Sequence, residues 1–329
     1  MTTNKWPEIR RRQRGVYLRQ LLAVLIDEGP LTARELSELC GLSVVTLNMI
    51  LRQFGERGLV EVGDLRQSGR GPAARTYRVP REALQTVAVV HRPGSLIAAY
   101  VDPVKTGPVT ARGARHDRPD PGQLATATAD AVRQANAVPD RLRHVVVGVR
   151  DRPEPDDIAW QHRFEADLGA RLGCTVRVRT NTELAALAEA EHGAARDVEN
   201  FMLVTTDSDG EPALKHVIGG VPHRGAHGMA GSLGRLAEHL SSPDERLIST
   251  LTAACLVADP ALVVLGGSLA SAGSQNLRNK VHRNLTRALP VAPEVLTSTL
   301  EGDAALQGAV RQARIGARKQ LLDVLTPPE

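Results

Sequence analysis

Two short helical segments joined by a glycine, at residues 32–57, constrain the fold of this chain more than any other stretch. Thr32 and Glu35 have the spacing of a capping box, in which each side chain accepts a hydrogen bond from the other residue's backbone, so a helix is predicted to begin here. Gly41 is predicted to end this helix in the left-handed conformation. The inward-facing side chains of this helix are predicted to be Leu36, Leu39 and Cys40.

A second helix is predicted to follow directly, with Ser43 as its N-terminal cap. Its apolar side chains recur every three or four residues and predict one buried face: Leu47, Ile50, Leu51 and Phe54. Two helices about a tight turn, the second with an outer face that fits a groove, are typical of a helix-turn-helix. An ordinary helical hairpin in a packed core is the alternative interpretation.

The outer face of the second helix carries the predicted DNA contacts: Ser43, Val44, Val45, Thr46, Asn48, Met49 and Arg52. Val45 is expected to pack against thymine methyl groups, and Asn48 is expected to pair with a base edge. Thr46 and Arg52 are expected to contact phosphates or the groove wall.

The segment after the second helix predicts a two-stranded wing. Residues 59–62 and 76–79 are Val- and Tyr-bearing runs bounded by Gly and Pro. The Gly- and Arg-rich hairpin supplies predicted contacts to the DNA backbone or minor groove, namely Arg66, Arg70 and Arg75. A surface hairpin without DNA contacts is the alternative. Residues 1–14 form a basic arm that includes Arg11 and Arg12; it either touches DNA or is a frayed terminus.

The charge of the chain is concentrated where the helix-turn-helix lies. Residues 1–84 hold 14 Lys and Arg against 9 Asp and Glu, whereas the remaining residues hold 27 against 28. Phosphate binding requires such a positive excess. We expect no membrane attachment and a cytoplasmic location, because the sequence has neither a long apolar run nor the apolar segment of a secretion signal. Three isolated cysteines predict buried thiols, not disulfides or a metal site.

From residue 84 onward, strand-like and helix-like segments alternate, which predicts an α/β domain. A hairpin is predicted at residues 84–102, and the apolar run at 143–150 is typical of a buried parallel strand. Further helices are predicted near residues 160–172, 183–192, 245–258, 275–288 and 304–325.

Several segments, in their order along the chain, resemble the ROK family, named for repressors, open reading frames and kinases. GRGPAARTYRV at 69–79 resembles the wing of its regulators, and NTELAALAEAEHGAA at 181–195 resembles the helix after the catalytic Asn-Asp pair. GGVPHRGAHGMAGSLGRL at 219–236 resembles the approach to the sugar and zinc site, and ADPALVVLGGSLASAG at 258–273 resembles the Gly-Gly turn near the nucleotide.

The resemblance implies an α/β fold class: an α+β N-terminal winged helix-turn-helix followed by an actin/ribonuclease-H-like, two-lobed sugar-kinase-type domain. The implied domains are 1–82 and 83–329. Within the second, lobe one comprises about 83–180 plus a C-terminal helix at about 304–329, and lobe two comprises about 181–303.

The chain departs from the family at the positions that carry kinase chemistry. The first phosphate loop, with an Asp and paired glycines in the family, reads HRPGSL at 91–96, and the second reads TTDSDGEPALK at 205–215. The family's catalytic Asp falls on Asn181, whose amide cannot act as a general base near neutral pH. The positions that hold sugar and zinc fall on Ser232 and Arg235, and the Cys-rich zinc segment is missing. We therefore expect no catalytic residue, metal or cofactor.

What remains is a vestigial ligand cleft, defined by Asn181, Ser232, Arg235, Gly266 and Gly267. The two glycines are interpreted first as a tight turn, with nucleotide binding as the less favoured alternative. Because Arg179 and Arg235 are expected near this cleft, a small anionic or phosphorylated sugar is a possible effector.

These features favour a sequence-specific DNA-binding transcription regulator, expected to be a repressor, with a catalytically inactive kinase-like domain. A homodimer or dimer of dimers would bind double-stranded DNA at an inverted-repeat operator. A protein-interaction scaffold is the alternative function, and a carbohydrate kinase is the least favoured one.

Overall fold

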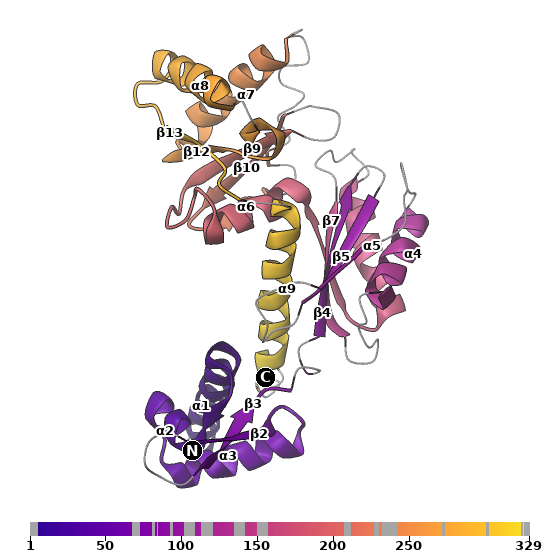
Figure 1. The fold of residues 1–329 in the computed structure, drawn as a ribbon, viewed down its shortest axis with the longest axis vertical. Coiled ribbons are helices and arrows are strands. Elements are labelled where there is room, and N and C mark those ends of the chain that lie inside the picture. Colours follow the sequence, from indigo (N-terminus) through magenta and orange to yellow (C-terminus); the bar gives the residue numbers. More distant parts are fainter. Residues whose placement is uncertain are drawn as a thin grey trace, which may run out of the picture.

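The computed structural model describes residues 6–67, 73–80, 83, 85–92, 95–101, 109–112, 121–134, 142–149, 157–206, 212–226, 230–231, 242–271, 274–300, 303–323 and 325. Figure 1 shows an elongated molecule with three parts in a row: an N-terminal unit, a central sheet and a second sheet. Within these ranges, no helix combines the length and apolar character that crossing a membrane requires.

The N-terminal unit is a winged helix-turn-helix, as predicted. It contains helices α1 (Trp6–Glu28), α2 (Ala33–Cys40) and α3 (Val44–Glu56) and strands β1 (Leu31–Thr32), β2 (Glu61–Arg66) and β3 (Ala74–Arg78). The strands form an antiparallel sheet in the order β1-β3-β2. Strand β1 was not predicted, because its two residues carry no periodic pattern of their own.

The capping signals read from the sequence are present at both helices. The Thr32 side chain accepts a hydrogen bond from the Glu35 backbone, and the Glu35 carboxylate accepts one from the Thr32 backbone at 2.7 Å. Gly41 ends α2 at φ 64°, in the left-handed region where a Cβ is disfavoured. Ser43 caps α3 by accepting from the Thr46 backbone at 3.2 Å. The turn between the helices is therefore specified locally.

Two predictions for this unit are wrong. Helix α1 begins at Trp6, so Arg11 and Arg12 lie in a helix and not in a terminal arm, and their contact with DNA stays a prediction. Pro7 falls in the first turn, where the missing N–H costs nothing, and the residues that follow are mostly good helix formers. Leu39 does not face inward but is 54% exposed. Leu36 and Cys40 form the buried face of α2, and Leu39 lies at the edge of that face.

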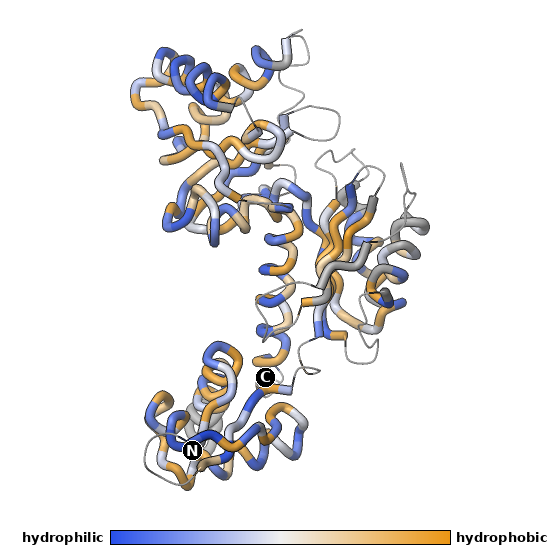
Figure 2. The backbone as a smooth tube through the Cα atoms, viewed as in Figure 1, coloured by the Kyte–Doolittle hydropathy of each residue, from blue (hydrophilic) through white to orange (hydrophobic). Residues whose placement is uncertain are grey.

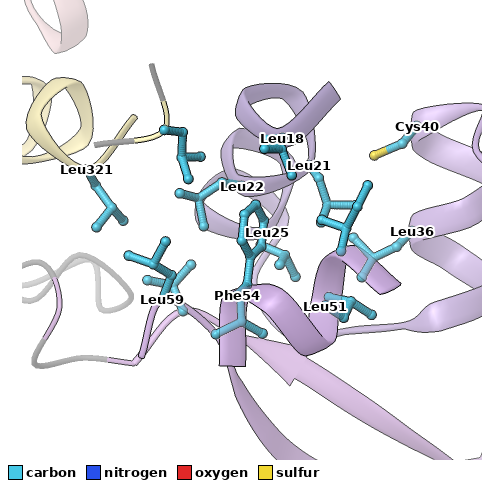
Figure 3. Close-up of a cluster of buried hydrophobic side chains, with 14 of the residues drawn as sticks. Leu18, Leu21, Leu22, Leu25, Leu36, Cys40, Leu51, Phe54, Leu59 and Leu321 are labelled. Atoms are coloured by element: carbon cyan, nitrogen blue, oxygen red, sulfur yellow. The ribbon is translucent and has the colours of Figure 1, made fainter. Parts of the chain in front are cut away.

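The core of the N-terminal unit includes residues from the far end of the chain. Leucines from α1 and α2 surround Phe54 of α3, and Leu321 and Leu325 join the same buried cluster, as Figure 3 shows for Leu321. Two ion pairs accompany this contact: Arg19 with Asp323, and Arg318 with Asp27, each at 2.7 Å. The C-terminal helix therefore anchors the winged helix-turn-helix to the rest of the protein.

The central sheet has the strand order β6-β5-β4-β7-β8. Its strands are β4 (Gln85–Arg92), β5 (Ser95–Val101), β6 (Val109–Arg112), β7 (Leu142–Val149) and β8 (Thr175–Thr180). Strands β4, β7 and β8 are parallel, and β5 and β6 continue antiparallel. The parallel strands β4 and β7 at the centre of the sheet are buried along nearly their whole length and are largely hydrophobic in Figure 2, as expected where helices cover both faces.

Helices α4 (Pro121–Gln134) and α5 (Asp157–Leu172) cover one face of the central sheet, burying Phe164 and Leu168 against its strands. The opposite face is covered by α6 (Asn181–His192) and by α9 (Ala304–Asp323), which runs on toward the N-terminal unit in Figure 1. Helix α9 approaches α6 so closely that a Cβ on Gly308 would lie 1.7 Å from the Leu184 carbonyl oxygen.

The second sheet has the order β11-β10-β9-β12-β13. Its strands are β9 (Phe201–Thr206), β10 (Pro212–Ile218), β11 (Val221–Pro222), β12 (Leu262–Leu265) and β13 (Glu294–Thr297). Helices α7 (Pro243–Ala258) and α8 (Ser274–Ala288) pack on one face, and α6 supplies Ala185 and Ala186 to the other. Because α6 also buries Leu184 and Leu187 against the central sheet, it belongs to both cores. The predicted α/β architecture is confirmed, whereas the boundaries at 82/83 and 180/181 stay predictions.

Candidate nucleic-acid interface and vestigial cleft

Helix α3 presents one buried and one exposed face. Leu47 and Phe54 are completely buried in the core of the N-terminal unit, with Ile50 and Leu51 beside them. The opposite face exposes Asn48 and three large apolar side chains, Val44, Val45 and Met49, which are 47%, 73% and 65% exposed. The structure therefore brings the predicted contacts of α3 together on one exposed surface, which we call the α3 outer face: Val44, Val45, Asn48, Met49 and Arg52.

The other polar groups at this helix already have partners within the protein. The Ser43 and Thr46 hydroxyl groups are hydrogen-bonded to each other at 2.9 Å. Arg52 lies 3.3 Å from the Glu56 carboxylate, with both side chains well exposed. Exposed pairs of this kind are worth under about 1 kcal/mol, so a phosphate group can replace Glu56 as the partner of Arg52.

The wing is tied to α2 by a charged contact that the sequence did not indicate. The Arg66 guanidinium donates to the Glu35 carboxylate, which is the same group that caps α2. The pKa of Glu35 is lowered, mainly by the hydrogen bond from the Thr32 backbone and further by Arg66. Arg66 therefore positions the wing in the free protein. Arg75 is exposed on β3, and Arg70 lies outside the described residues.

In the vestigial cleft, Asn181 makes a structural hydrogen bond. Its side-chain amide donates at 2.9 Å to the carbonyl of His91, near the end of β4, where the family's first phosphate loop would begin. The Asn181 Oδ1 is buried, has no hydrogen-bond donor among the described residues, and lies 2.6 Å from where a Cβ on Gly148 would be. Asn181 thus ties the start of α6 to β4.

Gly266 and Gly267 form a tight turn after β12. The Gly266 backbone donates to Val204 of β9 at 2.8 Å, and Gly267 has a φ of 58°, which favours glycine. The next residue, Ser268, is hydrogen-bonded to the Thr206 hydroxyl group. Backbone geometry and packing therefore account for both glycines, in line with their first interpretation.

Arg179, which was expected to add positive charge near the cleft, contacts two carboxylates, and its effect on an anion stays a prediction. Its guanidinium lies 3.1 Å from Glu183 and 4.0 Å from Glu165, and it donates to the Val178 carbonyl at 2.7 Å. Arg224 lies 3.4 Å from the same Glu183. Because Arg177 also lies 3.4 Å from Glu165, three arginines share these two carboxylates, and the group keeps an excess of positive charge.

Two positions of the vestigial cleft, Ser232 and Arg235, lie outside the described residues. Within the part of the chain that is described, no three His, Cys, Asp or Glu side chains are grouped to hold a metal ion.

The cysteines are free thiols, and burial raises the pKa of Cys174 to about 11, so its reactive thiolate is scarce near neutral pH.

Two regions of the chain match known protein families. Residues 17–61 match the winged helix-turn-helix DNA-binding family, and residues 153–245 match the ROK family. No curated protein sequence matches the chain.

Solved structures with the same fold include a transcriptional regulator and several kinases. A ROK family transcriptional regulator, a homologue of the E. coli MLC protein, is 14% identical with a TM-score of 0.65, over 95% of this chain and 98% of that one. A putative N-acetylmannosamine kinase from Listeria monocytogenes is 16% identical with a TM-score of 0.54, over 70% of this chain and 98% of its own.

A ROK family glucokinase from Streptomyces griseus, solved with glucose and AMPPNP, is 16% identical with a TM-score of 0.53, over 70% of this chain and 99% of its own. The similarity to the regulator thus extends over most of the chain, whereas the kinases share only part of it. The chain therefore joins a winged helix-turn-helix DNA-binding domain to a ROK family domain.

Proposed function

We propose that this protein is a sequence-specific transcription regulator that inserts α3 into the major groove of double-stranded DNA and represses transcription. The observation that carries the proposal is the exposed α3 outer face on a helix capped at Ser43, within a domain of DNA-binding type. The positive excess over residues 1–84 supports it, because phosphate contacts supply most of the non-specific affinity for DNA. Such a regulator acts where the chromosome lies, in the cytoplasm.

A two-fold homodimer, or a dimer of such dimers, would present two α3 helices to the DNA. The expected operator is an inverted repeat with half-site centres about one or two helical turns apart. In this proposal residues 1–82 bind DNA, and residues 83–329 hold the protomers together and receive the effector.

The kinase-like domain is proposed to be catalytically inactive. The amide of Asn181 takes the place of the family's catalytic carboxylate, and its hydrogen bond to the His91 carbonyl gives it a structural role. A kinase is the second candidate, since solved kinases share this fold. Sugar phosphate formed from hexose and ATP by the purified protein would favour that candidate.

The effector, in this proposal, is a small anionic or phosphorylated sugar. Its support is Arg235 together with the excess positive charge where Arg177, Arg179 and Arg224 share two carboxylates. Titration calorimetry with glucose 6-phosphate and with glucose tests the idea, and tight binding of glucose would contradict it.

Selection of bound sequences from random duplex DNA, at low and at physiological salt, tests the regulator proposal. We expect an inverted repeat to be enriched, and Asn48→Ala to lower the discrimination between cognate and mismatched sites by about 1–3 kcal/mol. Asn276→Ala, at an exposed position of α8, is the matched control and should leave the selection unchanged. Enrichment of no sequence at either salt would contradict the proposal and favour a protein-interaction scaffold.

A further inference from the structure

The α3 outer face is apolar to a degree that limits how it can read bases. Of its four exposed side chains in the first two turns, three are apolar: Val44, Val45 and Met49. In a helix-turn-helix, the N-terminal turns of the second helix are the part that reaches base edges. Hydrogen bonds to base edges would therefore have to come from the few polar side chains that lie around these three apolar ones.

Those polar groups are mostly engaged within the helix. The hydroxyl groups of Ser43 and Thr46 are bonded to each other at 2.9 Å, and Ser43 also accepts from the Thr46 backbone. Arg52 is paired with Glu56 one turn further along, beyond the turns that lead into the groove. In the first two turns of α3, Asn48 is the exposed side chain that can hydrogen-bond a base edge in two places, a geometry that suits adenine.

The major groove offers one apolar group to such a surface, the C5 methyl of thymine. On the basis of the proposed function, we propose that Val44, Val45 and Met49 read the operator half-site through thymine methyl groups, while Asn48 pairs with an adenine. The half-site core is therefore built of A·T pairs whose methyl groups face α3.

Duplex DNA is the occupant that the charges favour. The unit that carries this apolar face holds 14 Lys and Arg against 9 Asp and Glu over residues 1–84, which suits a polyanion. The same excess opposes docking of a second copy of this unit, because like charges would meet around the apolar centre. If the α3 outer face instead bound an apolar partner protein, the DNA-binding experiments described below should give negative results.

The test replaces thymine by deoxyuridine, one position at a time, in the operator obtained by selection. This substitution keeps base pairing and removes only the methyl group. A methyl group buried against a side chain is worth roughly fourfold in Kd, so single replacements at contacted positions should weaken binding about fourfold in fluorescence anisotropy. At a position where A·T is replaced by G·C, 5-methylcytosine should restore part of the affinity that plain cytosine loses.

Side-chain variants assign each methyl group to its reader. In Val45→Ala, deoxyuridine at the thymine that Val45 contacts should no longer weaken binding, because the contacting side chain is already gone. Met49→Ala should have the same effect at the thymine that Met49 contacts. Val257→Ala, at an 89% exposed position of α7, is the matched control and should retain the fourfold effect.

The outcomes separate the inference from the function on which it rests. Tight, sequence-specific binding that is unaffected by complete thymine-to-deoxyuridine replacement would overturn the methyl readout and leave the regulator intact. Selection of half-sites made of G·C pairs would do the same. Failure to bind any selected duplex would overturn both.

Discussion

Leu321 should hold the DNA-binding unit in place, and its truncation gives a direct test of that anchor. The side chain comes from the last turn of α9, is 6% exposed, and packs in the cluster that contains Phe54 and Leu59 (Figure 3). Truncation of a buried leucine to alanine costs about 2–5 kcal/mol. Because this cluster lies between two units that can relax toward each other, we expect a value near the lower end, about 2 kcal/mol.

The ion pairs beside Leu321 should matter less. Arg19 with Asp323 and Arg318 with Asp27 are geometrically close, yet their side chains are 42–50% exposed. Pairs exposed to this extent contribute about 0–1 kcal/mol and weaken with salt. We therefore expect Arg318→Ala to cost under about 1 kcal/mol, and the apolar contact to dominate the anchor at any salt concentration.

Native-state hydrogen exchange measures the effect where it should occur. Leu321→Ala should lower the opening free energy of amides in α1 and α3 by about 2 kcal/mol and leave those of α7 and α8 unchanged. Leu256→Ala, at a 63% exposed position of α7, is the control and should leave α1 and α3 unchanged. Equal protection of α1 and α3 in Leu321→Ala and in the wild type would refute the anchor.

Two further predictions concern the capping carboxylate and the seat of α9. Because the pKa of Glu35 is lowered in the folded state, its carboxylate stabilises the protein fully above the unfolded-state pKa of 4.5, and this stabilisation is lost as the pH falls through the folded-state pKa. Glu35→Gln should remove this loss of stability at acid pH in denaturant titrations. A pH profile of stability equal to that of the wild type would contradict the assignment. Gly308→Ala should destabilise the protein by about 1–3 kcal/mol or more, because the new Cβ would meet the Leu184 carbonyl. Gly15→Ala, which has open space around it inside α1, should stabilise the protein. Equal melting temperatures for the two variants would show that α9 is not tightly packed against α6.

The sequence predicted best what neighbouring residues determine. The capping box at Thr32, the glycine turn at Gly41 and the helical spacing of α3 are local signals, and the structure confirms them. The presence of Leu321 in the same buried cluster as Phe54 could not be predicted, because two segments so far apart in the chain share no sequence pattern that indicates their contact.

The same distinction holds within the candidate site. The helical period predicts which residues of α3 face outward, and they do so. The pairing of Arg66 with Glu35 and of Arg179 with Glu183 depends on where long side chains end in three dimensions. The count of positive residues therefore could not show which individual arginines are paired with carboxylates.

Asn181→Asp would restore the family's catalytic residue type, yet the structure predicts damage instead of activity. The Asn181 amide donates to the His91 carbonyl at 2.9 Å, and a carboxylate at that place can only accept. Ionised Asp would face a carbonyl oxygen in a partly buried position, so the lost bond and the unpaired polar group should cost about 1–3 kcal/mol.

The pH dependence of this variant separates a lost hydrogen bond from simple mispacking. A protonated Asp can donate to the His91 carbonyl as the amide does, so the stability difference between Asn181→Asp and the wild type should shrink as the pH is lowered through the pKa of the new carboxyl group. Asn181→Leu, which is similar in size and cannot titrate, should show a pH-independent difference. Urea titrations of the three proteins between pH 4 and pH 8 provide the comparison. A variant Asn181→Asp that is as stable as the wild type at pH 8 and phosphorylates hexose would mean that the amide is not structural and that the cleft has kept its chemistry.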